Sequence, residues 1–194
     1  MSLLLESKRL LLRPLAEEDV DLCLALFTDA AVVQHAIGMT SESEIRSQMS
    51  TWTRRGGNGC VGIWCITDKA TGEKLGTGAL LPMPIENNET DFSLLVPGAM
   101  PDADIEIGYF LKPSAWGRGY ATEAARRLLE FAFHDSPLQE VVATFDEDNV
   151  ASRVVLEKAG FRDHGTRFCY GEESMNFRIS RDEWLHAQSL SQSR

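Results

Sequence analysis

The stretch from residue 104 to residue 133 constrains the fold most, because its hydrophobic period changes within a few residues. Apolar side chains first recur at every second position, which is the period of a β-strand. These residues are Ile105, Ile107, Tyr109 and Leu111. Pro113 would end the strand, because proline cannot continue a hydrogen-bonded ladder. From Ala121 to Phe133 the apolar spacing becomes i, i+3, i+4 and i+7, which predicts a helix with one buried face.

A glycine-bearing turn joins the two elements and carries Gly117 and Gly119. Glycine lets the backbone come close to a ligand and adopt dihedral angles that are closed to other residues. The first N–H groups of the following helix have no partner within it, and a phosphate would satisfy them at the positive end of the helix dipole. A Gly-x-Gly turn is about as often a plain tight connection, but the strand before it and the helix after it favour an anion site.

The run from Trp116 resembles the Arg/Gln-x-x-Gly-x-Gly/Ala signature of the GCN5-related N-acetyltransferase (GNAT) superfamily. In that family the backbone amides of the signature hold the pyrophosphate of acetyl-coenzyme A. The tryptophan departs from the general pattern, but Trp-Gly-x-Gly-Tyr-Ala-Thr-Glu-Ala is typical of the Rim-type branch, whose members acetylate ribosomal-protein N-termini. The resemblance extends over nearly the whole chain, from Arg9 to Trp184.

The rest of the chain supplies further elements in a definite order. We expect strands at 8–14, 61–66, 74–81, 140–145, 162–170 and 175–179, and helices around 20–27, after the capping box Ser41-x-x-Glu44, and from Asn149 to Gly160. This order matches the α/β (α+β) GNAT fold that the resemblance implies. That fold has a mixed, mostly antiparallel central sheet of about seven strands, with helices on both faces and splayed middle strands, here those carrying Tyr109 and Val142.

The region 82–103 is the least regular, because it is rich in proline and contains a polar run from Glu86 to Asp91. Residues 92–96 are a candidate short strand within it. We interpret the region as an insertion near the substrate entrance, since loops on rigid scaffolds often carry specificity. A passive excursion of the chain is an equally good explanation.

Composition limits the domain organisation and the compartment. A chain of 194 residues with 43% hydrophobic residues suits one N-acetyltransferase domain over 1–187, followed by a polar tail, 188–194, that we expect to fray. No run approaches the length of a membrane span, and the N-terminal residues form no signal-peptide core. We therefore expect a cytoplasmic protein without a membrane partner.

Charge and cysteine spacing limit the partners. A net charge of −10 argues against nucleic-acid binding and suits a cationic partner, although it serves solubility equally well. The four cysteines lack Cys-x-x-Cys spacing, so we expect buried thiols and no metal site. A homodimer is left open.

The resemblance implies two sets of cofactor contacts. Main-chain groups that would bind the pantetheine arm and the acetyl group belong to Tyr109, Phe110 and Leu111. Groups that would bind the pyrophosphate belong to Gly117, Arg118, Gly119, Tyr120, Ala121 and Thr122. In the family's Asn-x-x-Ser element, Asn149 would contact the cofactor and Ser152 would lie near its sulfur. From the residues alone, Arg118 is equally a solvated turn residue, and Asn149 and Ser152 equally form a helix cap.

Two side chains are candidates for proton transfer. Glu106 lies on the strand face opposite Ile105 and Ile107 and is the candidate general base, directly or through water, with a surface or helix-paired carboxylate as the alternative. Many relatives have a tyrosine as general acid seven residues after the asparagine, but here that place holds Leu156. The role of acid therefore passes to Ser152 or to a water molecule.

The leading hypothesis is an acetyl-coenzyme A-dependent N-acetyltransferase that acts by direct attack of a primary amine in a ternary complex. A protein or peptide N-terminus is the preferred acceptor, because an α-amine has a pKa near ~8 and a lysine near ~10.4, so the α-amine is more often neutral. The alternatives are a small-molecule amine, such as a polyamine, amino sugar or antibiotic, and a non-catalytic acyl-coenzyme A sensor.

Overall fold

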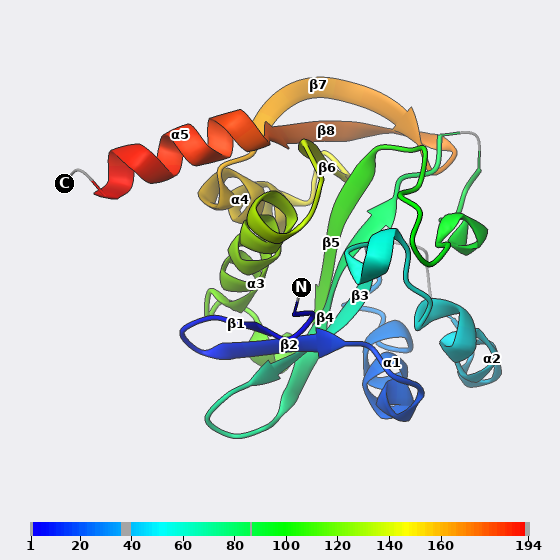
Figure 1. The fold of residues 1–194 in the computed structure, drawn as a ribbon. Coiled ribbons are helices and arrows are strands. Elements are labelled where there is room, and N and C mark those ends of the chain that lie inside the picture. Colours follow the sequence, from blue (N-terminus) through cyan, green and yellow to red (C-terminus); the bar gives the residue numbers. More distant parts are fainter. Residues whose placement is uncertain (1, 36–39, 86, 193–194) are drawn as a thin grey trace.

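A single twisted sheet of eight strands forms the centre of the protein, in a computed structural model that describes residues 2–35, 40–85 and 87–192 (Figure 1). Its order is β1-β2-β3-β4-β5-β6-β8-β7, and β5 and β6 are the parallel neighbours in an otherwise antiparallel sheet. The strands are β1 Leu5–Glu6, β2 Leu10–Pro14, β3 Gly62–Asp68, β4 Lys74–Pro82, β5 Ile105–Leu111, β6 Glu140–Phe145, β7 Arg162–Cys169 and β8 Glu172–Ser180. The expected fold is confirmed, with the two-residue β1 as an additional strand.

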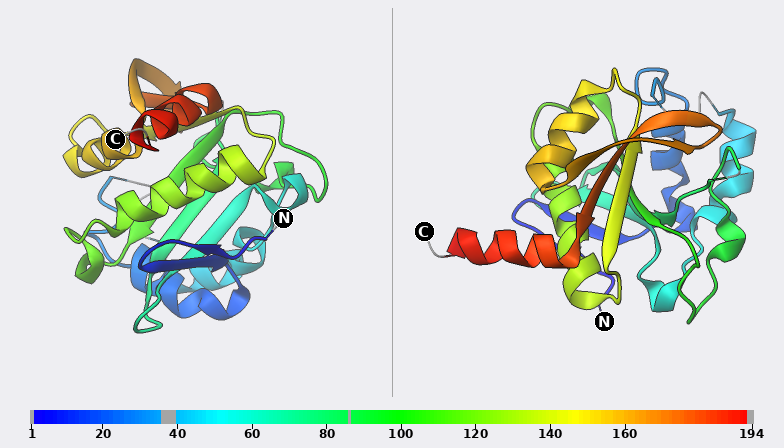
Figure 2. Two further views of the ribbon diagram at one scale, coloured as in Figure 1. Left: turned by 60° about the vertical axis from the view of Figure 1, so that its left-hand side comes forward. Right: turned by 90° about the horizontal axis from the view of Figure 1, so that it is seen from above.

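Helices cover both faces of the sheet, as expected (Figures 1 and 2). They are α1 Val20–Phe27, α2 Glu42–Trp52, α3 Tyr120–Glu130, α4 Val150–Ala159 and α5 Arg181–Gln192. On β3, Trp64 and Ile66 belong to the large core under α3 and α4, whereas Cys65 belongs to a smaller core under α1 and α2. Among the described residues, no helix combines the length and the apolar character needed to span a bilayer.

Two expectations about local structure are wrong. Residues 92–96 do not form a strand: Phe92–Leu94 is a 3-10 turn, because the side chain of Asp91 accepts a hydrogen bond from the Ser93 N–H at 2.8 Å and bends the chain. The segment expected to fray from residue 188 continues α5 as far as Gln192. A capping box starts this helix, since the Ser180 N–H donates to Glu183 and the Glu183 N–H donates to the Ser180 hydroxyl.

A buried carboxylate ties β2 and β4 to the start of α1. Asp19 is fully buried and accepts hydrogen bonds from Arg13 at 2.6 and 2.7 Å, and the Lys74 ammonium lies 3.0 Å away. Burial opposes its ionisation, but the bonds from Arg13, the Ala16 N–H and Lys74 lower the pKa of Asp19 to about 2. This group therefore stabilises the fold at pH values above the ordinary carboxyl pKa, and its contribution is lost as the pH falls from about 4 to 2.

We expect Asp19→Asn to lower the free energy of unfolding by about 2 kcal/mol at pH 7, and by less as the pH falls below 4. Urea unfolding at a series of pH values measures the difference. Asp21→Asn is the matched control, because Asp21 also contacts Lys74 but is mostly exposed, and it should cost less than about 0.5 kcal/mol. Equal unfolding midpoints for Asp19→Asn and the wild type at pH 7 would contradict the expectation.

Candidate active site

The parallel strands β5 and β6 separate soon after they meet. They pair at a single position, Glu106 opposite Val142. Because the Lys112 N–H donates to the Leu75 carbonyl, the even-numbered residues of β5 direct their main-chain groups toward β4, and the odd-numbered ones direct them toward β6. Beyond the pairing position, the main-chain groups of Tyr109 and the N–H of Leu111 therefore face a gap in the sheet, whereas the Leu111 carbonyl accepts a hydrogen bond from the Trp116 indole at 2.7 Å.

Phe110 differs from Tyr109 and Leu111, the other two residues expected to bind the pantetheine arm. It pairs with Thr77 in the ladder, so its main-chain groups face β4. Its ring packs edge-on against Phe27 of α1, with the ring centroids 5.3 Å apart. Phe110 therefore contributes a side chain to the α1 face and no main-chain group to the gap.

Glu106 lies at the mouth of the gap and bridges the separating strands. Its Oε1 accepts hydrogen bonds from the Thr144 N–H at 2.9 Å and from the Thr144 hydroxyl, and its Oε2 accepts one from the Tyr170 hydroxyl at 2.6 Å. The side chain satisfies an N–H of β6 that a continuous ladder would have paired with β5. Burial raises the pKa of Glu106, although the Thr144 and Tyr170 bonds and the charge of Arg167 oppose that rise.

An open cradle of main-chain N–H groups lies at the start of α3. Gly117 and Gly119 have φ angles of 69° and 77°, in the left-handed region, and Gly119 is the N-cap residue. The first helical hydrogen bond is donated by the Glu123 N–H to the Gly119 carbonyl, at 3.1 Å. The N–H groups of residues 117–122 donate no hydrogen bond to any described residue. A Cβ built on Gly117 would meet nothing within 4 Å, so space remains for a ligand beside the backbone.

Arg9, just before β2, and Asp68, at the end of β3, hold this cradle in place. Glu123 accepts hydrogen bonds from the Arg9 Nε at 2.6 Å and from the Arg9 N–H at 2.7 Å, and Arg9 also donates to the Arg118 carbonyl. The guanidinium groups of Arg9 and Arg118 lie over the Tyr120 ring, 4.4 and 4.9 Å from its centroid, and the Tyr120 hydroxyl donates to Asp68. Only the main chain of buried Tyr120 can therefore face a ligand.

The arginines place two positive charges beside the free amides, in a chain whose net charge is −10. A diphosphate suits this environment, because it accepts hydrogen bonds from main-chain amides and is attracted by guanidinium groups. Sequence analysis missed Arg9, which lies more than a hundred positions before the turn that it supports.

The start of α4 faces the same gap. Asn149 is its N-cap residue and accepts a hydrogen bond from the Ser152 N–H at 3.0 Å, so the capping interpretation of Asn149 is confirmed. The cap uses the main chain of Ser152 and not its hydroxyl. The Tyr109 hydroxyl lies 3.5 Å from the Ser152 carbonyl, and burial raises the pKa of Tyr109 to about 12. Leu156 is buried, one helical turn further on.

A histidine joins the segment after α1 to the turn before α4. The Nδ1 atom of His35 lies 3.2 Å from a carboxylate oxygen of Asp146 and 3.4 Å from one of Asp148. The ligand atoms of the three residues all lie within 4.8 Å of one another, close enough to share a metal ion. Sequence analysis assigned no metal site and no contact to this histidine.

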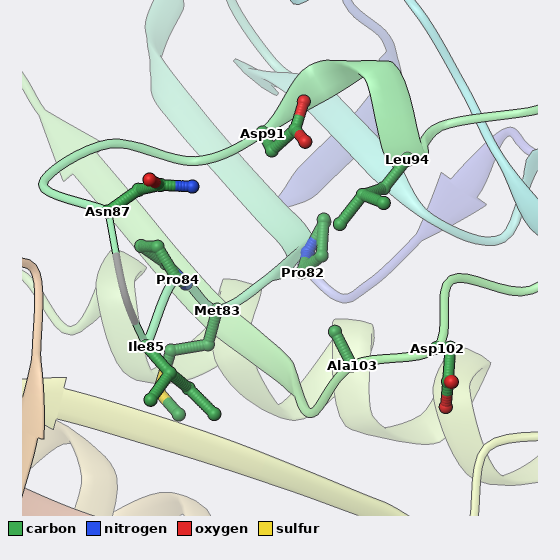
Figure 3. Close-up of a pocket in the computed structure, with 9 residues that line it drawn as sticks. All are labelled: Pro82, Met83, Pro84, Ile85, Asn87, Asp91, Leu94, Asp102 and Ala103. Carbon is green, nitrogen blue, oxygen red and sulfur yellow. The ribbon is translucent and has the colours of Figure 1, made fainter.

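The insertion between β4 and β5 surrounds a cavity of about 290 Å³ (Figure 3). Met83 and Ile85 lie on one side of it, and Asp91 and Leu94 lie opposite. Met83 also packs with Val142, Cys169 and Tyr170, the cluster that adjoins the Glu106 carboxylate. The cavity therefore lies next to the carboxylate end of the gap. Glu86, which belongs to the acidic run noted in the sequence, is outside the described residues.

The chain matches one family model and several known proteins. Residues 9–162 match the family described as "Acetyltransferase (GNAT) domain". YkkB of Bacillus subtilis is 34% identical over 136 residues, which cover 70% of each chain. The FsC-acetyl coenzyme A-N(2)-transacetylase of Aspergillus fumigatus is 29% identical over 199 residues, which cover 98% of this chain and 81% of the relative.

Solved structures support the fold. The aminoglycoside acetyltransferase AAC(6')-Ib, solved in complex with coenzyme A, superposes with a TM-score of 0.73 over 92% of this chain and 99% of its own. Its sequence is 18% identical, so this likeness concerns the fold alone.

Proposed function

Since the chain belongs to the GNAT family of acetyltransferases, we propose that it transfers the acetyl group of acetyl-coenzyme A to a primary amine, preferably a protein or peptide N-terminus. The observation that carries this proposal is the row of unpaired N–H groups at residues 117–122, beside a gap in the sheet that ends at a buried carboxylate. The amides can hold a diphosphate, the gap can hold the narrow pantetheine arm, and the carboxylate can accept a proton from an amine.

Each part of the site has a distinct task in this proposal. Acetyl-coenzyme A, when bound, supplies an acetyl group activated as a thioester. The amides of residues 117–122 hold its pyrophosphate, and Arg118 adds a charge-assisted contact. Main-chain groups of Tyr109 and Leu111 orient the pantetheine arm and stabilise negative charge that develops on the carbonyl oxygen. Glu106 receives the proton of the attacking amine, and the Ser152 hydroxyl or a water molecule provides a proton for the departing sulfur.

The acceptor is proposed from the chemistry of the cavity in the insertion. Asp91 and Asp102 give it negative charge that attracts an ammonium group, and its apolar wall suits a peptide side chain. An α-amine, with a pKa near ~8, loses its proton more readily than a lysine, near ~10.4. Together with the Trp-Gly-x-Gly-Tyr-Ala run at Trp116, this favours a Rim-type acetyltransferase.

A small-molecule amine is the second candidate. It is favoured by the similarity to the Aspergillus transacetylase, whose name specifies an N(2) amine and whose match covers 98% of this chain. A panel assay separates the candidates. Acetyl-coenzyme A is supplied with peptides bearing free or blocked N-termini, with lysine peptides, and with polyamines and aminoglycosides. We expect the highest kcat/KM on free N-termini. Cofactor binding without turnover on any amine would contradict the enzymatic proposal.

The Ser152 hydroxyl can be separated from the helix cap by two variants. Ser152→Ala keeps the N–H that donates to Asn149, so we expect unchanged thermal stability and a loss of roughly 10-fold or more in kcat. Asn149→Ala removes the acceptor and should cost about 1 kcal/mol of stability. Thermal unfolding and steady-state rates check both. A Ser152→Ala enzyme with the wild-type rate would assign the acid role to water.

A further inference from the structure

The Glu106 carboxylate is too enclosed to meet an amine directly. Both hydrogen bonds to its Oε1 come from Thr144, and its Oε2 accepts from Tyr170. Only 9% of the surface of Glu106 is exposed to solvent, whereas Tyr170 is partly exposed. A base in this position therefore needs a group that carries the proton to it from the acceptor side.

Tyr170 is held in a fixed position beside Glu106. With Gly171 it forms the two-residue turn between β7 and β8, and its φ of 53° is the positive angle that such a hairpin turn requires, so the hairpin fixes its backbone. Tyr170 packs against the cluster that contains Met83. Asn88 of the insertion lies close to Gly171, the next residue, since a Cβ on Gly171 would be 2.4 Å from the Asn88 Oδ1. The turn and the insertion together direct the Tyr170 hydroxyl at Glu106.

Tyr170 is unsuited to act as a base alone. Burial and the adjacent Glu106 charge raise the pKa of Tyr170, while the Thr90 hydroxyl acts in the opposite direction. Free tyrosinate is therefore scarce at neutral pH. A phenol can still pass a proton onward without ionising, provided that it gives up its own proton as it receives another.

We propose that Tyr170 is a catalytic residue that relays the amine proton to Glu106, an inference that rests on the proposed acetyl transfer. The phenolic oxygen takes a proton from the amine nitrogen as that nitrogen forms its bond to the acetyl carbon. At the same time the phenolic proton moves across the 2.6 Å hydrogen bond to Oε2 of Glu106. Tyr170 ends neutral, and Glu106 ends as a carboxylic acid that later returns its proton to solvent. Met83 lines the cavity of the insertion and packs in the same cluster as Tyr170, so an acceptor in that cavity would approach from the side of the tyrosine.

The test is Tyr170→Phe, with Thr144→Val as the matched control. The first removes the donor to Oε2, and the second removes a hydroxyl donor to Oε1 but keeps the Thr144 N–H bond. We expect Tyr170→Phe to lower the single-turnover rate on the best peptide of the panel by about 100-fold, with unchanged calorimetric affinity for coenzyme A. Thr144→Val should lower that rate by less than about 10-fold.

Rates in mixtures of H2O and D2O distinguish a relay from a purely positioning role. The rates of the wild type and of Thr144→Val should follow a curve as the deuterium fraction increases, because two protons move together. The rate of Tyr170→Phe should depend on the deuterium fraction linearly or not at all. Were Tyr170→Phe to unfold, 3-fluorotyrosine placed at position 170 would replace it and should change the rate while keeping the curvature.

Two results would overturn the relay. One is a Tyr170→Phe rate within about 3-fold of the wild type, which is far below the effect of a lost acid–base group. The other is a straight dependence on deuterium fraction in the wild type. Absence of turnover by the wild type on every amine would overturn the proposed function, and the relay with it.

Discussion

Replacing Gly119 by leucine should abolish measurable binding of coenzyme A while the protein stays folded. The new side chain would extend from the N-cap of α3 into the space beside the free amides. Within the protein its Cβ would meet only the Arg9 Nη2, at the ordinary contact distance of 3.6 Å. The cost to stability should be that of a left-handed residue, about 1–2 kcal/mol. Isothermal titration calorimetry measures the affinity, and circular dichroism verifies the fold.

Gly165→Leu is the matched control for this variant. Gly165 has a φ of 81°, and a Cβ there would meet nothing within 4 Å, so the backbone cost is the same. It lies on β7, at the edge of the sheet and away from α3 (Figure 1). We expect Gly165→Leu to lose similar stability and to keep its affinity for coenzyme A. Equal affinities for the two variants would contradict the cradle.

Replacing Glu106 by glutamine should lower kcat by roughly 10²- to 10⁴-fold, because it removes the proton acceptor from the site. The affinity for coenzyme A should not change. In the wild type the rate should rise with pH through the raised pKa of Glu106, and this limb of the profile should be missing from the variant. An unaltered rate and pH profile would exclude Glu106 as the base.

The same variant should lose no stability, although it loses activity. Because the pKa of Glu106 is raised in the folded state, its favourable contribution is complete below the unfolded pKa and is lost as the pH rises through the folded value. Glutamine carries no charge at any pH and can still accept from Thr144. Glu106→Gln should therefore be at least as stable as the wild type at pH 7, with the difference closing toward pH 4. A purely structural carboxylate would give an inactive and less stable protein.

The features that sequence analysis predicted are those encoded by local pattern. The change of period around Trp116, the capping box at Ser41 and the N-cap at Asn149 each involve residues a few positions apart. Such patterns determine where an element begins and which face it buries. The gap between β5 and β6 was expected from the family resemblance, and their single paired position agrees with it.

The features that sequence analysis missed depend on contacts between distant segments. Glu106 was predicted as the candidate base from its place on the strand, but its hydrogen-bond partners are Thr144 of β6 and Tyr170 of a turn that lies 64 positions away. Tyr170 carries little local signal apart from the glycine that follows it. Residues 92–96 were misassigned because their apolar character resembles that of a strand, whereas the preceding Asp91 turns the chain.

The central claim is that unpaired amides at the start of α3 bind the diphosphate, and an NMR titration of the ¹⁵N-labelled protein tests it most directly. On addition of coenzyme A, the amide resonances of residues 117–122 should shift downfield and saturate together. Pantetheine, which lacks the diphosphate, should leave them in place and move those of Tyr109 and Leu111. Binding of coenzyme A with the resonances of residues 117–122 unmoved would contradict this account.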